Sequence, residues 1–395
     1  MKGKKNILKK LRKRVILTNR IITDNLKIGK RVMKKYILVL LFLFIFLLSS
    51  IFYGRYIVSV KKEISIGKEK GNDNYIFGRI EDVAVDEKGN IYILDSIRER
   101  IQKFDRNGKF LFTTGKPKFH FKNIGDYQKN LGIVDEVVRK EGIKPDELFH
   151  PKKLFYKKNK LYVLDIDKVC IYSSSHNELL RTIPLNNLIG RWIFVNNNDE
   201  IVIGGIKLDS DKIFHVFDEN GNLKYSFGDY FDIPPDIRSS LPKEFNSKVI
   251  ATPSWCYYCV KTNKYYLLNP FKYEIKIYQG KKLNKVITPP IKGYRTTPPQ
   301  GIVHYINGKF AGYSTGFIAP PTIIKRGDYL FVFHPDIELG FCSVDVFKNN
   351  VLQETLKADI NGFPIVMDKE GYIYCIREEN GSYSLTKYLF ILSEN

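Results

Sequence analysis

A repeated pattern of four short apolar segments constrains the fold of this chain more than any other feature. Between residues 81 and 115 the segments EDVAVD, NIYILDS, RIQKFDR and FLFTTG alternate apolar and polar side chains. A period of two residues is typical of β-strands with one buried face. Lys88-Gly89 and Asn107-Gly108 lie between segments and accept the backbone conformations of tight hairpins. We therefore expect one antiparallel four-stranded propeller blade here.

The same order of segments recurs along the rest of the chain, and the last recurrence is one strand short. The recurrences lie at residues 153–185, 193–228, 258–289, 321–357 and 364–391. Residues 60–67, VKKEISIG, match the outermost strand of the first and third blades. Pairing them with the last blade would close the ring and leave no blade with an unpaired inner edge. The sequence therefore predicts an all-β, six-bladed β-propeller over residues 60–395, and the alternative is that 60–67 is a linker.

Residues of the first blade also follow a family pattern. They are Phe77, Glu81-Asp82-Val83-Ala84-Val85-Asp86, Gly89-Asn90-Ile91-Tyr92-Ile93-Leu94-Asp95, Arg100-Ile101-Gln102-Lys103-Phe104-Asp105 and Gly108-Lys109-Phe110. This segment resembles an NHL repeat, the blade type of many bacterial six-bladed propellers. The similarity is recognisable over 149–228 and 361–392, although the proline usual before the first strand is absent from the first blade. The resemblance implies the fold and a binding role but no reaction, because one fold hosts many functions.

An uncharged apolar run follows a strongly basic N-terminus. Residues 1–35 contain fourteen lysines and arginines and one acid, Asp24, which accounts for +13 of the chain's net charge of +22. The run from Tyr36 to Tyr53 is long enough to span the ~30 Å apolar core of a bilayer as a helix. A basic flank favours the cytoplasmic side. We therefore expect a basic cytoplasmic segment at 1–35 and a transmembrane signal anchor at 36–54. The propeller would then lie outside, in the periplasm or the extracellular space.

A second start site is compatible with the same residues. Translation from Met33 would give a short basic region, an apolar region and the small residues Ser49 and Ser50, the pattern of a secretory signal. An uncleaved anchor fits better, because the apolar run exceeds the ~7–15 residues usual for such a signal. Both starting points place the propeller outside the cytoplasm.

Three long insertions indicate where a ligand would bind. They lie at 116–152, 229–257 and 290–320, each between the outer strand of one blade and the inner strand of the next. Such connections emerge on one face beside the central channel, and insertions on one face often form the binding face. The candidate binding residues are Tyr230, Phe231, Arg238, Trp255, Tyr294, Arg295, His304 and Tyr305. The alternative is that these rings pack the insertions onto the propeller.

Catalytic and metal-binding patterns are weak. The six histidines show no zinc-protease spacing, and neither a phosphate-binding loop nor a nucleophile elbow occurs. The candidates for a metal site in the channel are Asp95, Asp165, Asp167, His215 and His334. Acids at strand ends usually cap turns, so we expect no cofactor here. Ca²⁺ or Zn²⁺ is the ion that a converging set of these residues would hold.

The five cysteines show no disulfide framework. Cys256 and Cys259 form a C-x-x-C at the edge of the inner strand expected at 258–263 in the fourth blade. Positions i and i+3 of an extended strand point to opposite faces, which disfavours a bond between them. The remaining cysteines lie in apolar segments and are typical of core residues.

These observations favour one function class. We expect a membrane-tethered, extracytoplasmic binding or scaffold module for a protein, peptide or glycan partner. The alternative is a metal-dependent hydrolase or lyase with a divalent ion in the propeller channel. Nucleic acid is not an expected partner, because export would separate the propeller from the nucleic acid of the cytoplasm. In addition, the 49 basic residues beyond position 59 are nearly balanced by 41 acidic ones.

Overall fold

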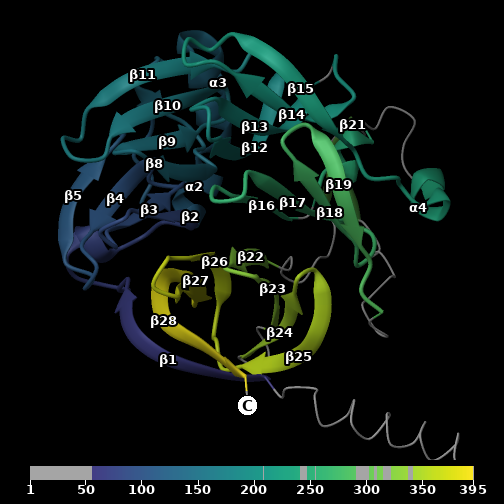
Figure 1. The fold of residues 1–395 in the computed structure, drawn as a ribbon. Helices are drawn as coiled ribbons and strands as arrows, with labels where there is room; N and C mark the ends of the chain where they lie inside the picture. Colours follow the sequence, from purple (N-terminus) through teal and green to yellow (C-terminus); the bar gives the residue numbers. More distant parts are fainter. Residues whose placement is uncertain are drawn as a thin grey trace, which may run out of the picture. The chain divides into compact units, whose positions relative to one another are not determined.

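The computed structural model describes residues 56–207, 209–240, 247–253, 255–290, 302–306, 309–314, 322–336 and 341–394. Residues 58–392 form one compact unit. Its strands make six four-stranded antiparallel sheets, which Figure 1 shows arranged in a ring. The six-bladed β-propeller expected from the sequence is confirmed.

Each blade is one sheet whose first strand lies innermost, where neighbouring inner strands touch around the ring. Blade 1 contains β2 (Ile80–Val85), β3 (Ile91–Asp95), β4 (Arg100–Phe104) and β5 (Phe110–Thr114). Blade 2 contains β8 (Lys153–Lys157), β9 (Lys160–Leu164), β10 (Lys168–Ser173) and β11 (Leu179–Pro184). Blade 3 contains β12 (Leu188–Val195), β13 (Ile201–Lys207), β14 (Lys212–Phe217) and β15 (Leu223–Asp229).

The remaining blades repeat this order. Blade 4 contains β16 (Trp255–Cys259), β17 (Lys264–Leu268), β18 (Ile275–Gln279) and β19 (Lys282–Ile287). Blade 5 contains β22 (Thr322–Arg326), β23 (Tyr329–Asp336), β24 (Phe341–Lys348) and β25 (Val351–Ala358). Blade 6 contains β26 (Phe363–Met367), β27 (Tyr372–Glu379) and β28 (Ser382–Glu394), and its outermost strand is β1 (Tyr56–Ile66).

A recurring side-chain turn shapes the hairpins of the blades. In blade 1, one carboxylate oxygen of Asp86 accepts the backbone N–H groups of Lys88 and Asn90. Gly89, the third residue after Asp86, has a φ of 82°. The same pair of hydrogen bonds, two and four residues on, forms at Asp105, Asn196, Asp218 and Asp368. Asx turns of this kind set the hairpin locally, which explains why the repeat is visible in the sequence.

The two ends of the propeller meet in blade 6. Strand β1 pairs with β28, as the sequence predicts for residues 60–67, and begins earlier, at Tyr56. Ile66 is 2% exposed and packs with residues of blades 1 and 6, including Phe77 and Tyr374. Gly67 approaches the neighbouring strand so closely that a Cβ there would lie 2.6 Å from the carbonyl oxygen of Tyr383. The N-terminal strand therefore closes the ring.

The core is divided among the interfaces between blades. In the described part of the chain, each boundary between neighbouring blades has its own cluster of buried apolar residues. Between blades 3 and 4, for example, Trp192 and Phe194 pack with Cys256 and Tyr258. Because each blade packs on both neighbours, the position of one inner strand fixes the position of the next.

The insertions contain their own short elements. The first contains β6 (Lys116–Pro117), α2 (Ile124–Lys129), α3 (Leu131–Glu141) and β7 (Glu147–Leu148). The second contains α4 (Pro235–Ser240) and α5 (Lys248–Ala251). The third contains a hairpin of β20 (Ile302–Ile306) and β21 (Lys309–Ser314). A 3-10 turn, η1 (Asp73–Tyr75), precedes blade 1.

One strand boundary differs from the sequence expectation. The inner strand of blade 4 is Trp255–Cys259, not residues 258–263. Residues 260–263 form the following turn, in which the N–H of Thr262 bonds to the carbonyl of Cys259 and Asn263 has a φ of 51°. Trp255 and both cysteines of the C-x-x-C therefore lie in a strand.

The basic segment 1–35 and the expected anchor 36–54 lie outside the described residues. Within the part of the chain that the structure describes, no helix has both the length and the apolar character needed to cross a membrane.

Ring closure can be tested at Ile66. Ile66→Ala should lower the free energy of unfolding by about 2–5 kcal/mol, because it leaves a cavity in the interface between blades 6 and 1. Val351→Ala, on the outer strand of blade 5 and 59% exposed, is the matched control and should change little. Urea unfolding followed by circular dichroism measures both. Equal, small effects would show that β1 does not hold the ring.

Candidate functional site

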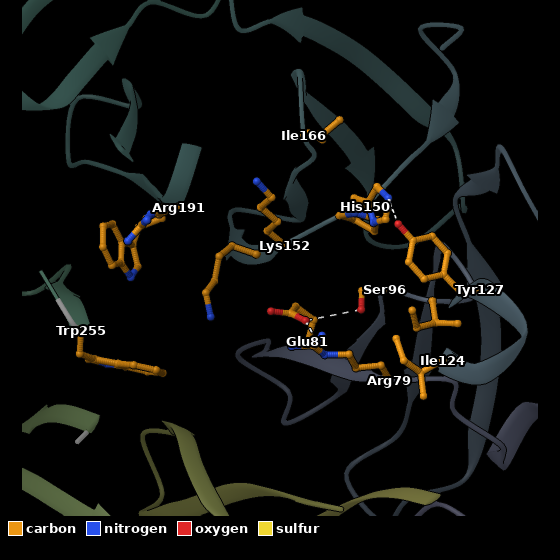
Figure 2. A pocket seen from close by; sticks show the side chains of 14 residues that line it. Arg79, Glu81, Ser96, Ile124, Tyr127, His150, Lys152, Ile166, Arg191 and Trp255 are labelled. Carbon is orange, nitrogen blue, oxygen red and sulfur yellow. Dashed lines mark hydrogen bonds and ion pairs between the residues drawn. The ribbon is translucent and has the colours of Figure 1, made fainter. Parts of the chain in front are cut away.

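An open cavity of about 550 Å³ lies where the inner strands of four neighbouring blades begin (Figure 2). The inner strands contribute Glu81 of blade 1, Lys153 of blade 2, Arg191 and Trp192 of blade 3, and Trp255 of blade 4, while Arg79 and Lys152 come immediately before β2 and β8. The first insertion adds Ile124, Tyr127 and His150, and the connection between β3 and β4 of blade 1 adds Ser96. Small-molecule sites typically have this size. The cavity therefore sits on the face from which the insertions emerge.

A buried carboxylate fixes the blade 1 side of the cavity. The fully buried Asp95, at the end of β3, accepts the backbone N–H groups of Gly78 and Arg79 at 3.0–3.1 Å. The guanidinium Nε of Arg100 lies 3.7 Å from the same carboxylate. Burial raises the pKa of Asp95, and these hydrogen bonds oppose that shift. Asp95 thus positions Arg79 at the entrance to β2.

Two further buried carboxylates hold the ends of the first insertion. Glu99 accepts the N–H of Phe119 at 2.8 Å, and Asp165 accepts the N–H of Phe149 at 2.9 Å. Burial raises the pKa of Glu99 to about 8, and the nearby charge of Asp165 raises it as well. Burial also raises the pKa of Asp165 to about 6, although Lys168 lies 3.2 Å away and opposes the shift. The segment next to His150 is therefore anchored to blades 1 and 2.

Two of the four cations in the cavity have carboxylate partners. The Nε of Arg79 lies 3.1 Å from the Glu81 carboxylate. The ammonium of Lys153 lies 3.5 Å from the Asp82 carboxylate and 5.3 Å from the centre of the Trp255 ring. A cation over an aromatic face is attracted to the ring. These contacts tie the two cations to the walls of the cavity.

The other two cations, Lys152 and Arg191, have no carboxylate within ion-pair distance among the described residues. Arg191 donates a hydrogen bond to the Thr252 hydroxyl at 2.6 Å. Burial lowers the pKa of Lys152 and the charge of Arg191 lowers it further, whereas the charges of Asp165 and Glu81 oppose this shift. Burial also lowers the pKa of Arg191. The charge of Arg191 therefore disfavours the charged form of Lys152. The lining of the cavity has an excess of positive charge, because four Lys and Arg side chains share it with the single carboxylate of Glu81.

Aromatic side chains line the walls. The chain has two tryptophans, Trp192 and Trp255, and both face the cavity. On the first insertion the Tyr127 hydroxyl lies 2.9 Å from Nε2 of His150, and the two rings meet edge to face. Figure 2 shows Trp255 on one side of the cavity and Ser96, Glu81 and His150 on another. The site offers positive charge, an indole surface and polar groups to one ligand.

Of the binding residues expected from the sequence, Trp255 lines the cavity. Phe231 is 3% exposed and belongs to the same core cluster as Trp192. The Tyr230 hydroxyl donates to the carbonyl of Gly205 at 3.2 Å, and Arg238 is exposed on α4. Part of the second insertion thus packs on the propeller, through a satellite cluster of Ile233, Ile237, Ile250 and Ala251. In this part of the insertion, the rings of Tyr230 and Phe231 pack onto the propeller.

The other expected binding residues belong to the third insertion. Tyr294 and Arg295 lie outside the described residues, and His304 and Tyr305 lie in β20, of which the backbone alone is described.

The residues considered for a metal site serve local contacts. Asp95 and Asp165 hold backbone N–H groups, and Asp167 pairs with Lys168 at 3.1 Å. His215 shares a hydrogen bond with Ser226, and His334 lies 2.8 Å from Asp345. In the described ranges, no three His, Cys, Asp or Glu side chains come together as metal ligands. All five cysteines are buried.

The cations of the cavity were missed from the sequence. Arg79, Lys152, Lys153 and Arg191 are scattered over 113 positions of the chain. A signal does exist, because two of the four inner strands have Arg or Lys at, or immediately before, their first residue. It becomes visible once the strand boundaries are known.

Comparison with known proteins supports the fold class alone. No protein-family model matches the chain, and no curated protein sequence matches it. A solved structure from Bacteroides fragilis, whose name marks it as a candidate exported protein, is similar with a TM-score of 0.52 and 12% identity, over 86% of this chain and 95% of that one. A member of the DUF4221 family from Bacteroides vulgatus is similar with a TM-score of 0.51 and 12% identity, over 86% of this chain and 99% of that one. At this identity the likeness shows the propeller fold.

The buried carboxylates predict a pH dependence of stability. With the pKa of Glu99 near 8 when folded, the folded chain holds a proton between roughly pH 5 and 8 that the unfolded chain has lost. The proton bound to Glu99 stabilises the folded state at low pH, and this stabilisation is lost as the pH rises toward 8. Glu99→Gln keeps a hydrogen-bond acceptor for Phe119 without the titration. The melting temperature of Glu99→Gln relative to wild type should therefore rise from pH 5 to pH 8.

The exposed Glu219→Gln is the control for this measurement, and its difference from wild type should not vary with pH. Differential scanning calorimetry gives the melting temperatures. A pH-independent difference for Glu99→Gln would show that Glu99 titrates normally.

Proposed function

We propose that this chain is an extracytoplasmic, membrane-tethered propeller of NHL type that binds a protein, peptide or glycan at the mouth of its channel. The observation that carries the proposal is the cavity itself, which is lined by both tryptophans of the chain and by two cations that have no carboxylate partner among the described residues. An open, partly apolar cavity with a few converging polar groups is the usual form of a ligand site.

The electrostatics of the cavity support a binding role. Like charges in a partly desolvated place lower the stability of a folded protein, because water screens them less there and each charge disfavours the other. Within the described residues neither Lys152 nor Arg191 makes an ion pair, and Arg191 is held by a hydrogen bond to the neutral Thr252 hydroxyl. Perturbed charges of this kind gather at functional sites. A bound ligand would supply the missing partner.

The N-terminal sequence supports the proposed location. Fourteen basic residues followed by an uncharged apolar run are typical of a signal anchor with a cytoplasmic N-terminus. A site outside the membrane meets envelope components and extracellular ligands. The positive cavity would not meet nucleic acid there.

Binding can be tested through the tryptophans. Because both line the cavity, tryptophan fluorescence of the full-length protein, excited selectively over its 25 tyrosines, reports on that place. Titration with peptide and glycan fractions of the cell envelope should give a saturable change with at least one fraction. Trp255→Ala should weaken binding at least about tenfold, through loss of an aromatic contact, with Trp192 left as reporter.

Leu223→Ala, on the outer strand of blade 3, is the control and should bind like wild type. If no fraction changes the fluorescence, or if Trp255→Ala binds as tightly as wild type, the cavity is not the binding site.

Topology can be tested by cysteine labelling, because the native cysteines are all buried. Lys160→Cys adds an exposed thiol to blade 2, and Lys13→Cys adds one to the basic N-terminal segment. A membrane-impermeant maleimide added to intact cells or spheroplasts should label the first and spare the second until lysis. Labelling of Lys13→Cys alone in intact cells would place the propeller in the cytoplasm.

A further inference from the structure

We infer that the ligand of this cavity is an acidic glycan whose anionic group sits between Lys152 and Arg191 and whose sugar ring lies against Trp255. The inference rests on the proposed function and adds the chemical class of the ligand.

The charge of the cavity selects an anion. Arg79 and Lys153 are already neutralised by Glu81 and Asp82, at 3.1 and 3.5 Å. Lys152 and Arg191 remain, and Figure 2 shows both at the same cavity. A carboxylate, sulfate or phosphate between them would relieve their mutual repulsion and accept charge-assisted hydrogen bonds. One N–H of Arg191 is taken by the Thr252 hydroxyl, which holds the guanidinium in place and leaves further donors for the anion.

The walls of the cavity select a ring with hydroxyl groups. The half-buried indole of Trp255 offers an apolar surface on which the C–H face of a sugar ring can pack. Ser96, Glu81 and the Tyr127–His150 pair stand on another side and can exchange hydrogen bonds with sugar hydroxyls. Glu81 also disfavours a second anionic group on that side. The arrangement fits one charged group at one end of a polar, ring-shaped ligand.

An acidic peptide fits the same charge less well. Extended peptides are usually bound through their backbone, by pairing with a strand or by a series of side-chain pockets along a groove. Here the polar groups that line the cavity are side chains from the entrances of four blades, gathered in a single cavity of about 550 Å³. A compact ligand with hydroxyl groups on each ring can form hydrogen bonds with more of these polar side chains than an extended peptide can.

The test is isothermal titration calorimetry of the full-length protein in detergent. The probes are tetragalacturonate, a chondroitin sulfate tetrasaccharide and a phosphorylated mannose oligosaccharide, each with its neutral form made by methyl esterification, desulfation with esterification, or dephosphorylation. A hexaglutamate peptide tests the other ligand class. At least one acidic glycan should bind, and its neutral form should bind at least about tenfold more weakly, because the contacts to the charged group are lost.

Lys152→Met gives the sharpest variant. It should weaken binding of the acidic glycan about ten- to a hundredfold, the effect of losing one hydrogen bond between charged groups. Without ligand it should raise the melting temperature, because burial and the charge of Arg191 disfavour the charged lysine more than Asp165 and Glu81 favour it. Lys160→Met, exposed on the same blade, is the matched control and should change neither quantity.

The outcomes separate this inference from the proposed function. If a neutral glycan binds as tightly as its acidic form, or if hexaglutamate binds and the glycans do not, the acidic-glycan inference is overturned while a binding site at the cavity stands. If no probe binds and the envelope fractions leave the fluorescence unchanged, both fail. A lower melting temperature for Lys152→Met would show that this lysine stabilises the fold, which also overturns the inference.

Discussion

The pairing of β1 with β28 is the contact on which the rest of the structure depends. The cavity is built from four separate blades, and their relative positions are set by the apolar clusters between neighbours. A ring of blades is rigid when it is closed, because each blade then packs against a neighbour on both sides. Ile66 places the N-terminal strand in the closing interface, beside blade 1, which carries Arg79 and Glu81.

Within the closed ring, buried carboxylates hold the backbone around the cavity. Asp95, Asp165 and Glu99 each accept backbone N–H groups from segments that border it. Burying these acids costs free energy, which their raised pKa values express. The cost is compatible with stability because the interfaces between blades supply a large apolar core. The same core tolerates Lys152 and Arg191, which have no ion-pair partner in the described part of the chain.

Local patterns made most of the fold predictable from the sequence. Alternating strands and Asx turns such as that of Asp86 act within a hairpin, and the short last blade indicated closure by the N-terminal strand. The site was harder to predict, because its cations converge from blades far apart in the sequence. Trp255, chosen for its aromatic character, lines the cavity, whereas Phe231, chosen for the same reason, packs in the core. Residue type alone does not distinguish a ring facing a cavity from a ring buried beneath it.

A structure of the full-length protein determined with a bound acidic oligosaccharide would test the central claim most directly. The account predicts the anionic group between the Lys152 ammonium and the Arg191 guanidinium, with a sugar ring against the Trp255 indole. An oligosaccharide bound elsewhere on the propeller, with the cavity between the four inner strands left without it, would contradict the account.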